Sequence, residues 1–402
     1  TPRTSSAASD VYKRQFVPHE SALGGPNSPW DGLSLAPLSN PREDHASMPL
    51  HHRQWLIAQL DAMWMQSSPL FSEPGVAETV VLDTQGNNAR LIHGAWLAES
   101  DTLWIGDSNV PFQASSSPCA GEIVVGPNSV IHVGSSFTSG VLNISAGTGL
   151  TVGAAGALYV HSGSELVIQP GGIVKLDGGR LVLEGDAQLR IEQGGTLELW
   201  EDSEWHIQEE TGHVDVAGTV FVAAHQEAQW AGVGSVFWQA SSHLWLGSQS
   251  TLHCSGNDTG IWEMMGPVAW RGPGHVHLEG IKVEWQSEGH LHATCRTSLE
   301  ECELTATDHA SPSLFSEGRI RISNSKVGAL LWEHQGQDAM APSASAFFAQ
   351  DTQWEDCHVT LSECSGHIGD NHFVHSTLRV QEPQNPFKVT GNVLQALSLI
   401  HI

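Results

Sequence analysis

The sequence predicts an all-β fold, a right-handed parallel β-helix with three short strands in each rung of about 22–25 residues. The first observation is a rhythm of apolar pairs, each pair split by one residue, which restarts every seven to nine residues between Leu150 and Val216. Each pair is a period-2 strand, too short to stand alone, that points two side chains to one face. The second observation is that glycine, asparagine, aspartate or serine separates the pairs, and these residues accept tight corners. Uniform short strands of this kind fit a coil in which every pair points inward and stacks on its neighbours. The nine pairs are Leu150/Val152, Leu158/Val160, Leu166/Ile168, Val174/Leu176, Leu181/Leu183, Leu189/Ile191, Leu197/Leu199, Trp205/Ile207 and Val214/Val216.

Bulky residues indicate the rung length. Trp238, Trp262 and Trp285 recur at intervals of about 24 residues, which is three steps of about eight. We therefore expect three strands per rung and an interior stack of these three tryptophans. The stack is interpreted as a core feature before it is interpreted as a platform for sugars.

The segment before the coil differs in composition. It is rich in proline, serine and asparagine, and it contains one convincing helix, His51 to Gln66, with Leu56 and Leu60 on its apolar stripe. We expect this helix to cap the coil, because an exposed coil end would template edge-to-edge pairing; a separate preceding domain is the alternative. The predicted segments are an irregular N-terminal part with the helix at about 51–66 (16–75), strands that lead into the coil (76–117), the regular β-helix (118–305) and less regular rungs with a loop near 333–346 (306–396).

Both ends of the chain have an unusual feature at the codon level. Read back into codons, Ser5 to Gln15 resemble a common transposase-type sequencing adapter, and Leu397 to Ile402 resemble the reverse complement of its inner end. We therefore expect residues 1–15 and 397–402 to be derived from an adapter and the natural chain to be a fragment of a metagenomic sequence, with flanking domains missing.

Beyond Leu299 the rhythm changes to phrases of the form apolar-x-x-(Cys/Ser/Asn)-x-apolar. They are LEECEL, ISNSKV, WEDCHV, IGDNHF and VTGNVL, between Leu299 and Leu394. Small polar side chains at one corner can stack from rung to rung and bond to the turn backbone. The sequence thus predicts a structural corner stack with the members Cys302, Ser325, Asn371 and Asn392.

These phrases, from about Pro118 to Leu394, resemble the right-handed parallel β-helix superfamily that includes pectate lyases and many bacterial surface proteins. The regular glycine-rich half followed by Cys/Asn-cornered rungs also resembles large secreted proteins of gliding marine bacteria. The resemblance implies a secreted or cell-surface location, and it implies little about activity, because the fold hosts both enzymes and inert rods. Polygalacturonase-like members carry adjacent carboxylates as acid and base, and this chain has no adjacent Asp-Asp pair.

The composition restricts the partners. With 17 Lys+Arg against 44 Asp+Glu, the formal net charge is −27, which predicts repulsion of nucleic acid, anionic lipid and acidic polysaccharides unless calcium mediates. No apolar run approaches the roughly 20 residues that a membrane helix needs. No cofactor is expected, with calcium left open. A polysaccharide or a cell-surface component is the expected kind of partner.

The six cysteines form no C-x2-C pair of the kind that zinc sites use. Cys295 and Cys302 are separated by about one strand-to-strand step, and so are Cys357 and Cys364. We interpret them as small buried residues in turns, with disulfides as the alternative.

Two sets of polar residues are candidates for chemistry. The acid-x-His pairs Asp356/His358 and Asp370/His372 are the best place to seek a catalytic or metal cluster, although the spacing between the two pairs does not match a rung. The other set recurs at the spacing of one rung, and it is His253, His277 and Glu301, three residues that suit a divalent metal. In both cases a solvated outer face is the plainer interpretation.

Trp245 lies between Leu244 and Leu246 and should point outward, where it would stack on a sugar or make a lateral contact. The sequence therefore favours an extracellular or cell-surface stalk or scaffold, structural or adhesive, without catalysis of its own. The alternatives are a polysaccharide lyase or hydrolase of the β-helix class and a carbohydrate-binding rod that uses outward aromatic residues.

Overall fold

The structure is a computed structural model. It describes residues 122–401 except 126–127, 136–138, 145, 147–148, 257–259, 287–288, 308–311, 337–345, 384–386 and 396–397. Before residue 122 it describes the backbone of six short strands alone, and the helix predicted at 51–66 lies outside the described residues.

Every strand pairing in the described part of the chain is parallel, and every third strand belongs to the same sheet. Sheet A contains β1 (Ser68–Pro69), β4 (Ala95–Leu97), β7 (Glu122–Val125), β10 (Gly149–Gly153), β13 (Ile173–Asp177), β16 (Thr196–Trp200), β19 (Thr219–Val222), β22 (His243–Leu246), β25 (Pro267–Arg271), β28 (His290–Ala293), β31 (Ser313–Ser316), β34 (Leu331–Gln335), β37 (His358–Ser362), β40 (Thr377–Gln381) and β43 (Ser398–His401).

Sheet B follows sheet A along the chain. It contains β2 (Thr79–Asp83), β5 (Thr102–Gly106), β8 (Val130–Val133), β11 (Ala157–Val160), β14 (Arg180–Leu183), β17 (Ser203–Ile207), β20 (Glu227–Gly232), β23 (Thr251–Ser255), β26 (His275–Glu279), β29 (Arg296–Glu300), β32 (Ile320–Ser323), β35 (Phe347–Gln350), β38 (Gly366–Gly369) and β41 (Phe387–Thr390).

Sheet C completes each rung. It contains β3 (Arg90–Ile92), β6 (Phe112–Ala114), β9 (Val141–Ile144), β12 (Glu165–Ile168), β15 (Gln188–Ile191), β18 (His213–Val216), β21 (Ser235–Trp238), β24 (Ile261–Met264), β27 (Lys282–Trp285), β30 (Glu303–Ala306), β33 (Lys326–Gly328), β36 (Gln353–Glu355), β39 (His372–Val374) and β42 (Val393–Gln395).

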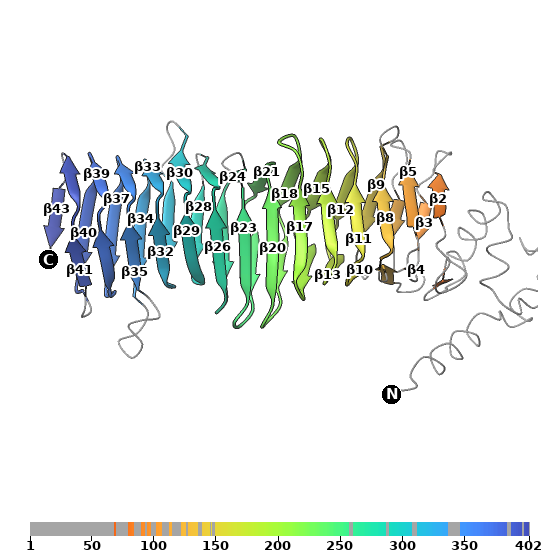
Figure 1. The fold of residues 1–402 in the computed structure, drawn as a ribbon, viewed down its shortest axis with the longest axis horizontal. Helices are drawn as coiled ribbons and strands as arrows, with labels where there is room; N and C mark the ends of the chain where they lie inside the picture. Colours follow the sequence, from red (N-terminus) through yellow and green to blue (C-terminus); the bar gives the residue numbers. More distant parts are fainter. Residues whose placement is uncertain are drawn as a thin grey trace, which may run out of the picture.

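The predicted all-β parallel coil with three strands per rung is confirmed. Figure 1 shows the rungs stacked along one long axis, with the order of the sequence running along that axis. At about 4.8 Å per rung, the 15 strands of sheet A give a rod on the order of 65–70 Å long. All nine predicted apolar pairs point inward, and each of their side chains is at most 3% exposed. The core is therefore a single column that runs inside the three sheets.

The rung length is nearly constant only from Gly149 to His243 in sheet A, because the next rung, from His243 to Ala269, is longer and the rung from His275 to Arg296 in sheet B is shorter. In sheet A, Leu150 pairs with Val174 and Val174 pairs with Leu197, two rungs of nearly equal length. Later the lengths vary, because the rung from Ser313 to Leu331 is much shorter and the rung from Leu331 to His358 is longer. Both fall outside the predicted range, which is thus too narrow for the C-terminal rungs. The strands keep their register while the corners absorb different numbers of residues.

Strands of the three sheets also occur in the segments before residue 118 and after residue 396. Strands β2 to β6 are members of the same three sheets, and β1 lies inside the segment 16–75 that was predicted to be irregular. Strand β34 runs to Gln335, so residues 333–335 of the predicted loop belong to sheet A. Within 397–402, Ser398–His401 forms β43 beside β40.

Candidate functional site

The two acid-x-His pairs lie on different sides of the coil. Asp356 occupies the corner between sheets C and A with a φ of 53°, and His358 opens β37 in sheet A. Asp370 occupies the corner between sheets B and C with a φ of 56°, and His372 opens β39 in sheet C. The neighbour of Asp356 is His375 of the next rung, with 3.9 Å between Oδ1 and Nδ1. The structure does not assemble the four predicted residues into one site.

The predicted histidine ladder is only partly assembled. His253 and His277 are paired on the outer face of sheet B, with ring centroids 5.5 Å apart. The next position in this column is Ser298, because the rung is shorter here than the one before it, whereas Glu301 sits in the adjoining corner. The carboxylate near His277 belongs to Glu300, with 4.0 Å between Nε2 and Oε2. Across the described residues, no three His, Cys, Asp or Glu side chains form a group that would hold a metal ion.

The three predicted tryptophans are all buried, at 3% exposure or less, but they do not form one column. Trp238 stands in register with Met264 and then Trp285, while Trp262 stands in the neighbouring column. Trp238 and Trp262 still touch, with ring centroids 5.5 Å apart. Trp230 was not among the predicted members of the stack, but its ring centroid is 4.8 Å from that of Trp262. These rings are core and are closed to ligands.

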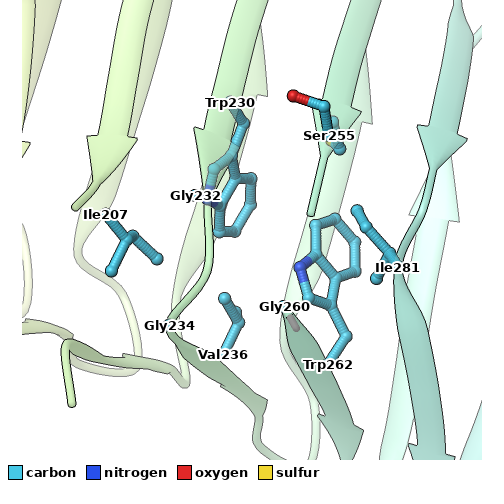
Figure 2. A pocket seen from close by; sticks show the side chains of 10 residues that line it. Ile207, Trp230, Gly232, Gly234, Val236, Ser255, Gly260, Trp262 and Ile281 are labelled. Carbon is cyan, nitrogen blue, oxygen red and sulfur yellow. The ribbon is translucent and has the colours of Figure 1, made fainter. Parts of the chain in front are cut away.

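A small cavity beside this aromatic core carries no ligand site. Figure 2 shows the side chains that line it at the corner between sheets B and C, with the rings of Trp230 and Trp262 between Ile207 and Ile281. Its volume is about 10 Å³, which is the space of one water molecule at most.

The predicted corner stack lies between sheets B and C, and it includes a member that the sequence reasoning missed. The amide of Cys302 donates to Oγ of Ser325 at 3.1 Å, and the amide of Asn371 donates to Oδ1 of Asn392 at 2.9 Å. Thr352 stands between these two pairs, and its amide donates to Oδ1 of Asn371 at 3.1 Å. The stack is a structural device, since its side chains satisfy the turn backbone inside the coil.

The phrase WEDCHV belongs to another corner. Cys357 lies between sheets C and A, and its amide donates to Oγ of Ser376 at 3.1 Å. Among the described residues, five cysteines are free and buried. Burial raises the pKa of the thiols of Cys302 and Cys357 to about 11 and that of Cys364 to about 12. Thiols with such pKa values are poor nucleophiles and poor metal ligands at neutral pH.

The outward tryptophan of the sequence analysis belongs to a row of aromatic side chains on sheet A. Trp245 is 43% exposed, and it is in direct register with Phe221 on the preceding strand. Trp200 lies one strand further along, with its ring centroid 6.5 Å from that of Phe221. A cationic residue lies at each end of these three rings. The Nζ of Lys175 is 4.4 Å from the ring centroid of Trp200, and Arg271 is in register with Trp245 on the next strand. We call Trp200, Phe221 and Trp245 the aromatic row.

Local contacts hold the first ring of the row in place. The indole of Trp200 donates to Oε2 of Glu198 at 3.0 Å, and Lys175 is held by Asp177 at 2.8 Å. The sequence contained a signal for the row, because Phe221 and Trp245 each stand between two inward apolar residues and are one rung apart. A rigid sheet thus presents three outward rings on three successive strands.

A solved structure and this chain share a distant likeness. It is the crystal structure of a hyper-glycosylated TibA55-350 fragment, whose glycosylation is catalysed by TibC, at 10% identity over 78% of this chain and 99% of the other, with a TM-score of 0.25. No protein-family model and no curated protein matches the chain. A TM-score of this size supports no transfer of function. In the described part of the chain, no helix is long and apolar enough to cross a membrane.

Proposed function

We propose that this chain is part of an extracellular or cell-surface β-solenoid rod that adheres to polysaccharide through the aromatic row, without catalysis of its own. The observation that carries the proposal is the exposure of Trp245 at 43% beside Phe221 on the outer face of sheet A. Trp200 and Phe221 are half-buried and Trp245 is exposed, so the three rings form a contiguous apolar surface and not a single exposed ring. Contiguous exposed apolar surfaces mark contact sites more often than single apolar residues do.

The chemistry of the row favours a sugar. The C–H face of a pyranose ring stacks on an indole, while the hydroxyl groups around its edge need polar partners. Lys175 and Arg271 supply donors at the two ends of the row, and Glu198 supplies an acceptor beside Trp200.

The geometry favours a chain over a single sugar. Neighbouring strands lie about 4.8 Å apart, and Phe221 and Trp245 are in register along the rod axis. Trp200 lies two residues further along its strand, because Glu198 is the register partner of Phe221. The row therefore runs obliquely across three strands and offers successive contacts to an extended polymer. The sheet is fixed by a fully buried core, so ordering it on binding costs little.

The enzyme alternative would need acid and base groups that converge on one groove. The two acid-x-His pairs lie on different sides of the coil, Asp370/His372 beside sheet C and Asp356/His358 beside sheet A. His358 shares sheet A with the aromatic row, but its strand β37 is five strands of that sheet beyond β22, which carries Trp245. This arrangement supports adhesion over cleavage.

The test is binding of the whole chain to insoluble and soluble neutral polysaccharides, with reducing-end release followed in the same samples. Trp245→Ala should weaken binding at least tenfold, which corresponds to about 1.4 kcal/mol. Leu331→Ala is the matched control, because Leu331 is an exposed apolar side chain on the same sheet, outside the row. Equal binding by Trp245→Ala and the parent chain would contradict the role of the row, and release of reducing ends would contradict the absence of catalysis.

A further inference from the structure

The outer face of sheet B in the C-terminal half has a charge opposite to that of the chain as a whole. Arg296, Arg319 and Arg321 lie on β29 and β32 or directly before β32, and all three side chains are exposed. Arg296 pairs with His275, and the amide of Thr297 donates to the carbonyl of Arg319, so the arginines sit on adjacent strands. We call Arg296, Arg319 and Arg321 the arginine patch.

The patch continues along sheet B in both directions. Toward the N-terminus the outer positions hold His253, His275 and His277. Toward the C-terminus, the column that contains Arg321 continues through Phe348, His367 and Lys388.

The arginines of the patch are not used in ion pairs. In the described part of the chain, none of the three has a carboxylate partner, whereas Arg190, Lys282 and Lys326 on sheet C are paired with Glu165, Glu284 and Glu303. Arg319 instead lies over the ring of Phe348, with 5.1 Å from its Cζ to the centroid, which holds the guanidinium on the face.

Carboxylates stand at the rims of this face. Glu279 and Glu300 lie at the strand ends near the corner with sheet C, and Glu300 faces His277 at 4.0 Å. Glu317 lies at the corner with sheet A and faces His292, with 3.7 Å between Oε1 and Nε2. The middle of the face therefore has a positive electrostatic potential. Burial is the main cause that lowers the pKa of His275 to about 4, and the positive charges of His277, His253, Arg296 and Arg319 lower it further.

We infer that the arginine patch binds a sulfated polysaccharide. This goes beyond the adhesive role of sheet A, because it concerns another face and another ligand chemistry. Unpaired guanidinium groups on a rigid sheet match tetrahedral oxyanions through two parallel N–H donors. Guanidinium and sulfate esters are both weakly hydrated, so their pairing costs less desolvation than that of a carboxylate or an ammonium.

Because the molecule as a whole is strongly acidic, the patch favours a ligand whose negative charges are widely spaced. Nucleic acid carries one charge per about 1.7 Å of duplex and would meet the acidic rims along with the patch. A polysaccharide with sparse sulfate groups places a charge on the patch and neutral sugar over the rims. The formal charge of −27 thus excludes dense polyanions without excluding this ligand.

The experiment uses the whole chain and four probes, which are dextran sulfate of low substitution, unsulfated dextran, polygalacturonate and duplex DNA, each at low and at moderate salt. We expect binding to dextran sulfate that weakens with salt and falls at least tenfold in Arg319→Gln/Arg321→Gln. Arg190→Gln/Lys326→Gln removes the same formal charge from the paired residues on sheet C and should change binding less than twofold. Arg319→Lys/Arg321→Lys retains the charge without the bidentate donors, and an intermediate loss is expected.

Several outcomes would overturn the inference. They are equal binding by the two glutamine double variants, no binding to dextran sulfate, or stronger binding to polygalacturonate or DNA. Because the aromatic row is tested with neutral polysaccharides, a failure here leaves that proposal standing, and a failure there leaves this one standing. Hydrogen-exchange protection of the strand amides on both sides of the substituted rungs, measured alongside for each variant, shows whether the coil is intact.

Discussion

Replacing Asn371 with alanine removes the most connected side chain of the corner stack. Its Nδ2 donates to the carbonyls of Ala349 at 3.0 Å and Gly369 at 2.8 Å. Its Oδ1 accepts from the amide of Thr352 at 3.1 Å and from Nε1 of Trp354 at 3.3 Å. The side chain is 1% exposed, so water does not replace these partners without opening the corner.

The magnitude follows from these four hydrogen bonds. A typical bond contributes about 0.5–1.5 kcal/mol net, and a buried group left without a partner costs about 1–3 kcal/mol. We expect Asn371→Ala to destabilise the C-terminal rungs by about 4 kcal/mol. If the free energy of local opening falls by this amount, the hydrogen-exchange protection factor falls by roughly a thousandfold.

The assay is native-state hydrogen exchange at the amide of Thr352 and the indole of Trp354, because a stacked coil does not unfold as a single unit and one global midpoint is a poor measure. Gln353→Ala is the control, since Gln353 stands between these two residues and is exposed. A loss of less than about 1 kcal/mol at Thr352 in Asn371→Ala would refute the view that the corner stack, and not the strand pairing alone, holds these rungs.

Two further predictions concern titratable groups. The pKa of His132 is lowered from 6.5 to about 4, first by burial and then by the charge of His161. The unfolded chain therefore binds a proton there that the folded chain does not bind between pH 6.5 and 4, so stability should fall as pH drops through this window, by about 2 kcal/mol after solvent screening. Hydrogen-exchange protection of the amide of His161, which donates to the carbonyl of Val133, should differ less between neutral pH and the lower end of this window in His132→Gln, and an unchanged difference would contradict this cause. Burial raises the pKa of Cys295 and Cys364 to about 12, so iodoacetamide at mildly alkaline pH should label them only after unfolding. Labelling of the folded chain within minutes, detected by mass spectrometry, would show that these thiols are open to solvent.

The sequence predicted the inward side of the coil because burial depends on local alternation. A residue between two inward apolar neighbours points outward whatever the rest of the rung does, which is why the orientation of His253 and Trp245 was readable. The corner residues Cys302 and Asn392 were readable for a similar reason, since a small polar residue in a fixed phrase marks a turn.

Only the tertiary structure determined which residues of neighbouring strands lie side by side. A constant rung length placed Glu301 beside His277, but the rung there is shorter, so Ser298 takes that place. The same argument aligned Trp238 with Trp262, which stand in neighbouring columns.

The physical reason is that backbone hydrogen bonds fix the register of the strands, while the corners vary in length without disturbing it. Alternation along one strand thus determined which residues are core and which are surface. Which surface residues meet, as in the aromatic row beside Trp245 and the arginine patch around Arg319, was determined by the number of residues in each corner, and that number became visible only when the rungs were stacked.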